Sequence, residues 1–116
     1  MIIEDEMIVA LEVQYLLQDL GYESFDIAAT PQEAVRHALS RRPDLITADV
    51  MISGGTGIDA VREIIRRVGA IPHFYVTGTR DMLVGELAPV IVDKPIQHLD
   101  FVRACVSAFR GTRASS

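Results

Sequence analysis

The sequence has little of what several classes of protein require. Among its 116 residues are one cysteine and no tryptophan, and a lone cysteine forms neither an internal disulfide nor a thiolate metal cluster. No apolar run approaches the roughly 20 residues that span a bilayer, and the beginning, Met1 to Glu4, lacks the pattern of a signal peptide. We therefore expect a cytoplasmic protein in which Cys105 is part of the apolar core.

Basic residues are also scarce relative to acidic ones. The formal net charge is −5 and the isoelectric point is near 5.0. Without a basic stripe to neutralise phosphates, direct binding of nucleic acid is not expected. With 49% hydrophobic and 23% charged residues, the chain fits one domain with a single core. We place this domain at residues 1–110 and expect the polar tail, 111–116, to be disordered.

Apolar runs typical of strands alternate with amphipathic stretches that predict helices. The expected strands are Met1–Ile3, Phe25–Ala28, Asp44–Val50, Pro72–Thr77 and Val90–Val92. The expected helices are 7–20, 31–40, 58–68, a short one within 81–86, and 99–109. Five such alternations predict an α/β fold: a flavodoxin-like, five-stranded parallel sheet of order 2-1-3-4-5, with helices on both faces and a shortened fourth helix.

The spacing of apolar residues predicts which face of each helix is buried. The predicted inner faces are Ala10, Val13, Leu17 and Leu20; Ala34, Val35, Ala38 and Leu39; Ile58, Val61, Ile65 and Val68; and Leu99, Val102, Val106 and Phe109. Gly21 is expected to end the first helix, and Thr30 with Glu33 to begin the second as a capping box.

Three carboxylates are expected at neighbouring strand ends. Asp49 ends the central apolar strand, and Glu4 and Asp5 follow the first strand. In an open parallel sheet of this order, these two strand ends meet at the switch point, where ligands bind. Taken singly, Asp49 could cap a loop, and the acidic turn from Glu4 to Glu6 could favour a helix N-terminus through its dipole. Together the acids repel one another, and Mg²⁺, which prefers oxygen ligands, is the cation that we expect them to bind.

Two more polar side chains end the remaining strands. Thr77 ends the fourth strand with a hydroxyl group, and Lys94 follows the fifth with an ammonium group. A surface position for Lys94 is the plain alternative. A nucleophilic carboxylate, a metal, a lysine and a hydroxyl donor are the parts needed to receive a phosphoryl group as an aspartyl phosphate. Asp49 is the predicted nucleophile, because it ends the central strand.

Four short motifs, taken in order, resemble the receiver domain of two-component response regulators over nearly the whole chain. They are Ile3-Glu4-Asp5-Glu6, Pro43-Asp44-Leu45 with Ala48-Asp49-Val50, Val76-Thr77-Gly78, and Asp93-Lys94-Pro95. The resemblance implies that Asp49 is the phosphoacceptor, that Thr77 supplies a switch hydroxyl and that Lys94 contacts the phosphate. It also implies that Mg²⁺ is bound by Glu4, Asp5, Asp49 and the backbone carbonyl of Met51.

A narrower resemblance is to receivers of the alphaproteobacterial general stress response, including single-domain regulators. It rests on the segment 54–61 and on the compact stretch between Thr77 and Lys94. It also rests on residues 72–78, which are similar to a Pro-Phe-x-Phe-Ala-Thr-Gly motif and depart from it at His73 and Val76.

The switch residues depart from the receiver pattern at one position. Most receivers carry an aromatic residue three positions before the lysine, and Ile91 stands there in this chain. We therefore hypothesise that phosphorylation reorders the loop and short helix of residues 78–89 instead, through a hydrogen bond between Thr77 and the phosphate.

These features predict a signalling domain rather than an enzyme, with no chemistry beyond its own phosphorylation and dephosphorylation. Its expected partners are a histidine kinase or phosphotransfer protein and a downstream protein. No binding to a membrane is expected. The chain is expected to be a monomer, or a dimer that forms on phosphorylation. The main alternative is a pseudo-receiver that binds partners without phosphorylation. A small hydrolase or flavin-binding module is less well supported, because the segment 49–51 lacks the second acid of aspartyl-phosphate phosphatases and no aromatic-rich loop could stack on a flavin.

Overall fold

The structure is a computed structural model that describes residues 1–78 and 91–115. Its elements in chain order are β1 (Ile2–Ile3), α1 (Met7–Asp19), β2 (Ile27–Ala28), α2 (Pro31–Ser40), β3 (Ile46–Ala48), β4 (Met51–Ile52), β5 (Gly55–Thr56), α3 (Gly57–Val68), β6 (His73–Thr77), β7 (Ile91–Asp93) and α5 (His98–Ser115). The short helix predicted within 81–86 lies outside the described residues, as does most of the segment 78–89 of the switch hypothesis.

The main sheet has five parallel strands in the order β2-β1-β3-β6-β7. Counted without the small hairpin, this is the predicted order 2-1-3-4-5, so the flavodoxin-like fold is confirmed. The two additional strands, β4 and β5, pair antiparallel with each other and form a hairpin outside the sheet. The sequence did not predict this hairpin, which connects the end of β3 to α3.

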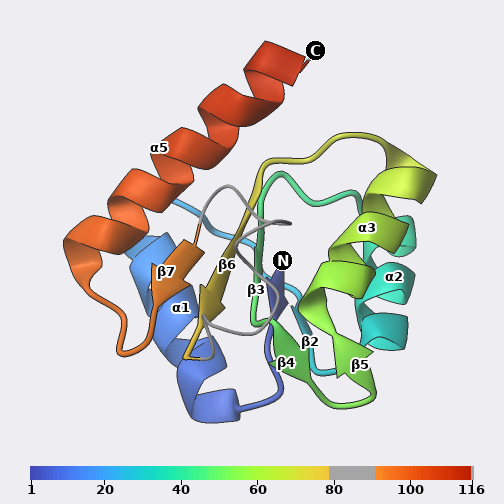
Figure 1. The fold of residues 1–116 in the computed structure, drawn as a ribbon, viewed down its shortest axis with the longest axis horizontal. Helices are drawn as coiled ribbons and strands as arrows, with labels where there is room; N and C mark the ends of the chain where they lie inside the picture. Colours follow the sequence, from blue (N-terminus) through green and yellow to red (C-terminus); the bar gives the residue numbers. More distant parts are fainter. Residues whose placement is uncertain (79–90, 116) are drawn as a thin grey trace.

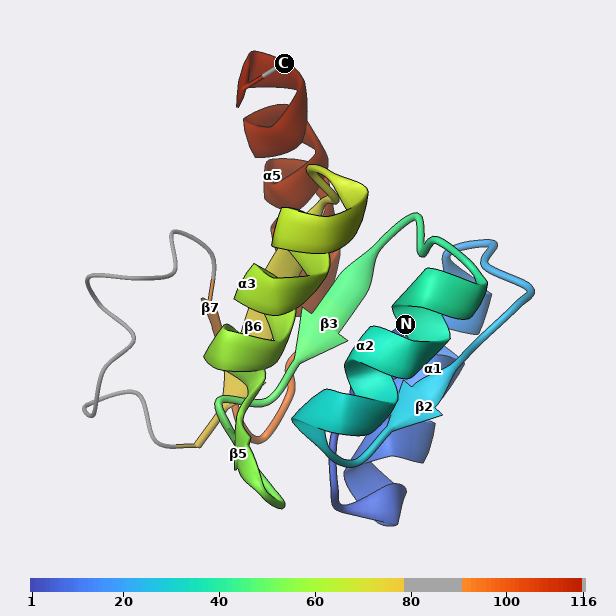
Figure 2. The same cartoon turned by 90° about the vertical axis from the view of Figure 1, so that its right-hand side faces the viewer.

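The helices cover both faces of the sheet (Figure 1). On one face, α2 and α3 pack over a cluster that includes Ile3, Ile46 and Tyr75. On the other face, α1 and α5 pack over a cluster that includes Phe74 and Val92. Figure 2 shows α2 and α3 side by side in front of the sheet. Because both faces of the sheet are covered, the strands are mostly apolar, as is typical of parallel sheets.

The helix ends follow the predicted local signals. The Thr30 hydroxyl accepts a hydrogen bond from the Glu33 N–H at 3.2 Å, and Pro31 occupies the first turn of α2. Gly21 lies just after α1 with a φ of 101°, a conformation that glycine adopts without strain. The start of α3 has a cap that the sequence analysis did not predict: Thr56 accepts a hydrogen bond from the Asp59 N–H at 3.1 Å.

The predicted inner face of α5 is wrong. Leu99, Val106 and Phe109 are 57%, 46% and 37% exposed, respectively. The buried residues are Phe101, Ala104, Cys105 and Ala108. Phe101 packs edge to face on Phe74 of β6, with ring centroids 5.2 Å apart. The buried face therefore combines Phe101 with small residues, whereas Leu99, Val106 and Phe109 face outward. The expected burial of Cys105 is confirmed.

Three further differences concern helix positions. Leu20 and Leu39, predicted to face inward, are 38% and 53% exposed. Leu20 is the residue at which α1 ends, and Leu39 lies in the last turn of α2. Helix α5 extends to Ser115, so helical backbone continues into the stretch predicted as a disordered tail. Among the helices that the structure describes, none is long and apolar enough to cross a membrane.

Candidate functional site

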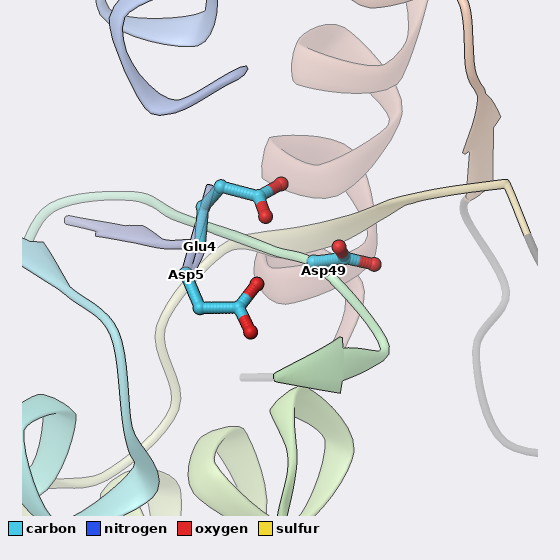
Figure 3. Close-up of side chains that lie close together, drawn as sticks. All are labelled: Glu4, Asp5 and Asp49. Carbon is cyan, nitrogen blue, oxygen red and sulfur yellow. The ribbon is translucent and has the colours of Figure 1, made fainter. Parts of the chain in front are cut away.

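The carboxyl ends of β1 and β3 place acidic residues side by side. Backbone hydrogen bonds continue past both strands: the Asp49 N–H donates to the Ile3 carbonyl at 2.9 Å, and the Glu4 N–H donates to the Ala28 carbonyl at 2.8 Å. Figure 3 shows Glu4 and Asp5 on the segment that follows β1 and Asp49 on the segment that follows β3, with the three carboxylates near one another. The sheet itself therefore brings together residues that lie 45 positions apart (Glu4 and Asp49).

The three carboxylates form a compact cluster. Oxygens from Glu4, Asp5 and Asp49 all lie within 4.8 Å of one another. Glu4 and Asp49 are buried, whereas Asp5 is exposed at the edge of the cluster. Charged carboxylates this close repel one another unless a cation lies between them or beside them. The set offers only oxygen ligands, which suits a hard cation and not a thiolate-binding metal.

Lys94 supplies one positive charge to this cluster from the loop after β7. Its Nζ donates to Asp49 Oδ2 at 2.9 Å and to Glu4 Oε1 at 3.1 Å. Burial alone would lower the pKa of Lys94, but the hydrogen bonds to Asp49 and Glu4 outweigh burial and raise the pKa above its usual value. The ammonium group is therefore retained at neutral pH, and the plain alternative of a surface lysine does not hold.

One ammonium group does not compensate three carboxylates. Burial raises the pKa of Glu4 to about 7, even though hydrogen bonds from Lys94 and from the Glu6 N–H favour the charged form. The nearby charge of Asp49 raises the pKa of Glu4 further. The site without a metal thus has too little positive charge, which is the electrostatic condition for binding a further cation.

Thr77 reaches the same edge of the sheet at the end of β6. Its side chain is buried, and it pairs in register with Asp93, the last residue of β7. The Thr77 carbonyl accepts a hydrogen bond from the Lys94 N–H at 3.1 Å. The backbone of Lys94 is therefore fixed to the end of the strand that carries Thr77, and the two predicted residues are neighbours.

The β4–β5 hairpin forms one border of the site. In an antiparallel pair, hydrogen-bonded and non-hydrogen-bonded positions alternate. The Gly57 N–H donates to the Val50 carbonyl at 2.8 Å, so the next pair, Met51 with Thr56, is a non-hydrogen-bonded one. The backbone carbonyl of Met51 is therefore not used within the hairpin.

Two residues of this hairpin region were missed by the sequence reasoning. The Ser53 hydroxyl donates to Asp5 Oδ2 at 3.1 Å. At Gly57, a Cβ would lie 1.9 Å from the Asp49 backbone oxygen, so only glycine lets α3 begin this close to the end of β3. The Ser53-Gly54 dipeptide is a turn signal that could have indicated the hairpin, but no sequence pattern indicates the contact at Gly57.

Comparisons with known proteins agree with this geometry. A family profile described as the response regulator receiver domain matches residues 1–100. The phyllosphere-induced regulator PhyR of Methylorubrum extorquens is 36% identical over 89 residues, which are 69% of this chain and 33% of that protein. The solution NMR structure of the PhyR receiver domain from Erythrobacter litoralis gives a TM-score of 0.83 at 28% identity, covering 93% of this chain and 86% of that one. The crystal structure of the anti-anti-sigma factor PhyR from Bartonella quintana gives a TM-score of 0.79 at 33% identity, covering 98% of this chain and 48% of that one.

These relatives define both the family and the extent of the similarity. The chain spans about a third of the length of the Methylorubrum protein and about half of the Bartonella protein. The PhyR matches confirm the predicted resemblance to stress-response regulators of the alphaproteobacterial type. With the profile match over most of its length, the chain belongs to the response regulator receiver domain family, the signalling domains of two-component systems.

Proposed function

We propose that this chain accepts a phosphoryl group on Asp49 in a Mg²⁺-dependent reaction and changes its affinity for a protein partner as a result. The observation that carries the proposal is the position of the Lys94 ammonium group, 2.9 Å from Asp49 Oδ2, beside an acidic cluster at the carboxyl edge of the sheet. A carboxylate nucleophile, a fixed cation and a metal-binding set in one place are the components of phosphoryl transfer to aspartate.

The reaction forms one bond to phosphorus and breaks another. An oxygen of the Asp49 carboxylate attacks the phosphorus of a phosphohistidine, and the phosphorus–nitrogen bond breaks. The departing imidazole keeps the bonding electron pair and takes up a proton. Negative charge accumulates on the phosphoryl oxygens during this transfer, and the Lys94 ammonium group is close enough to Asp49 to stabilise it.

The acidic cluster fits a magnesium ion. Mg²⁺ binds oxygen at about 2.1 Å, so ligands on opposite sides of the ion lie about 4.2 Å apart. The cluster oxygens lie within 4.8 Å of one another, a separation close to the one that such ligands would need. We assign Glu4, Asp5, Asp49 and the Met51 carbonyl to this ion. When bound, Mg²⁺ would neutralise carboxylate charge and accept phosphoryl oxygens as ligands.

Thr77 is the residue that we assign to signalling. Its hydroxyl belongs to a buried side chain at the end of β6, next to the backbone of Lys94. A hydrogen bond between this hydroxyl and the phosphate on Asp49 would change the position of Thr77, and with it the segment that follows β6.

The partners follow from the chemistry and from the relatives. The donor is a histidine kinase or a phosphotransfer protein, because phosphohistidine supplies the phosphoryl group. The relative from Bartonella quintana is named an anti-anti-sigma factor, and we propose a downstream partner that acts on transcription through a sigma factor. The chain itself is acidic, which does not favour direct contact with nucleic acid.

Chemical phosphorylation tests the proposal without knowledge of the kinase. Acetyl phosphate with Mg²⁺ should add one phosphoryl group to the protein, detected by intact mass and assigned to Asp49 by peptide mapping. The Asp49→Asn variant and an excess of chelator should abolish the addition. Asp44→Asn is the matched control, because Asp44 is exposed ahead of β3, and it should be phosphorylated normally. Folded wild-type protein that stays unmodified would contradict the proposal and favour the pseudo-receiver.

A further inference from the structure

We infer that Ser53 is a positioning residue for the metal site: its hydroxyl holds the Asp5 carboxylate in place and thereby raises the affinity for Mg²⁺. This inference rests on the proposed function, in which the acidic cluster binds Mg²⁺. The relevant contact is the hydrogen bond from Ser53 Oγ to Asp5 Oδ2 at 3.1 Å. It joins the β4–β5 hairpin to the loop after β1, across 48 positions of the chain.

Asp5 differs from the other two acids in how it is held. Glu4 and Asp49 are buried, and both accept hydrogen bonds from Lys94. Asp5 is exposed, and among the described residues Ser53 is the side chain that donates to it. An exposed aspartate without such a donor would occupy several rotamers, and fixing one of them on metal binding would cost conformational entropy.

The hairpin turn that carries Ser53 lies next to the start of α2. Ser53 and Gly54 form the two-residue turn between Ile52 and Gly55, and Gly54 has a φ of 80°, a conformation that glycine adopts without strain. A Cβ at Gly55 would lie 3.1 Å from Pro31 Cγ at the start of α2. The turn therefore lies against the start of α2, which limits how far the backbone that carries the Ser53 hydroxyl can move.

The hydrogen bond leaves Asp5 able to bind a cation. A carboxylate accepts up to about four hydrogen bonds or metal contacts through its two oxygens, and Ser53 uses one of these positions on Oδ2. A carboxylate whose orientation is fixed by a neighbouring donor binds metal more tightly than a free one, because its position is set before the ion arrives.

The test is a calorimetric Mg²⁺ titration of unphosphorylated wild-type protein and of Ser53→Ala. Because the contact is exposed, its loss should raise the dissociation constant about 3- to 10-fold. Ser53→Thr, which keeps the hydroxyl, should restore most of the affinity. Ser107→Ala, at an exposed position on α5, is the matched control and should bind as wild type does.

A second pair of variants distinguishes positioning from a general structural effect. In an Asp5→Ala background the further change Ser53→Ala should leave the dissociation constant unchanged, because Ser53 acts through the Asp5 carboxylate. An unchanged affinity in Ser53→Ala alone, or an equal loss in both backgrounds, would overturn the inference while leaving the proposed function intact. Absence of Mg²⁺ binding by the wild-type protein would overturn both.

Discussion

Replacement of Gly57 by alanine tests how closely the start of α3 approaches Asp49, the proposed phosphoacceptor. Gly57 is the first residue of α3, and its N–H donates to the Val50 carbonyl at 2.8 Å. A Cβ at this position would lie 1.9 Å from the Asp49 backbone oxygen, 3.0 Å from the Asp49 carbonyl carbon and 3.2 Å from Ala48 Cβ. The obstacle is backbone, which cannot rotate away as a side chain does.

The geometry sets the size of the effect. Ordinary contact begins at 3.4 Å, so α3 and the Asp49 carbonyl must separate by about 1.5 Å to admit the methyl group. Overpacking of this kind costs about 1–3 kcal/mol, and weakening the Gly57–Val50 hydrogen bond adds about 1 kcal/mol. We therefore expect Gly57→Ala to lower the free energy of unfolding by about 2–4 kcal/mol. A shift of about 1 Å at a reacting group can reduce its rate about 100-fold, so phosphorylation of Asp49 should also slow markedly.

Urea unfolding and the rate of phosphorylation by acetyl phosphate measure the two effects separately. Gly111→Ala is the matched control, because Gly111 lies in α5 and a methyl group added there would meet no atom within 4 Å. Alanine is the better helix former by about 1 kcal/mol, so the control should be as stable as the wild type or more so. A Gly57→Ala protein with wild-type stability and wild-type phosphorylation rate would refute the close approach of α3 to Asp49.

Three further predictions concern the charges and the core. Lys94→Met should lower the free energy of unfolding, measured in chelator, by about 2–3 kcal/mol, because two buried carboxylates lose their cation. Arg41→Met, which breaks the exposed ion pair with Asp26, is the comparison. An equal loss of unfolding free energy in the two variants would contradict the prediction. Phe101→Ala should cost about 3–5 kcal/mol in urea unfolding and Phe109→Ala less than about 1.5 kcal/mol; the reverse order would mean that α5 presents its other face to the sheet. Burial raises the pKa of the Cys105 thiol from 9.0 to about 11. The thiol therefore loses its proton at a higher pH in the folded state than in the unfolded state. The stability of wild type relative to Cys105→Ala should therefore be constant well below pH 9 and fall by about 2 kcal/mol between pH 9 and pH 11; a difference that does not change with pH would exclude a buried thiol.

The topology and the meeting of the site residues could be predicted from the sequence. Strand–helix alternation determines a parallel sheet, and the order of its strands places the ends of β1 and β3 together. Glu4 and Asp49 consequently meet, with Lys94 donating to both. The roles of these residues remain predictions, but their proximity follows from the topology alone.

The orientation of α5 could not be predicted, because this helix is apolar on more than one face. Leu99, Val106 and Phe109 form one apolar face, and Phe101 with Ala104, Cys105 and Ala108 forms another. Spacing favours the face with the larger residues, whereas close packing against β6 and β7 favours the face with the smaller ones. The choice depends on the shape of the sheet surface, which a one-dimensional pattern does not contain.

The hairpin and its contacts were missed for a different reason. Strands of two residues, such as β4 and β5, have no detectable periodicity. Ser53 contacts Asp5, and Gly57 lies close to the Asp49 backbone. Both contacts form only in the folded chain.

The most direct test of the central claim is reductive trapping of the acyl phosphate. Wild-type protein is phosphorylated with acetyl phosphate and Mg²⁺, treated with borohydride, digested and sequenced by mass spectrometry. Because borohydride reduces an aspartyl phosphate and leaves a free carboxylate unchanged, residue 49 should be recovered as homoserine only in the sample that received both phosphodonor and Mg²⁺. Homoserine at Asp5 or Asp44 instead, or aspartate retained at every acidic position, would contradict the assignment of Asp49 as the phosphoacceptor.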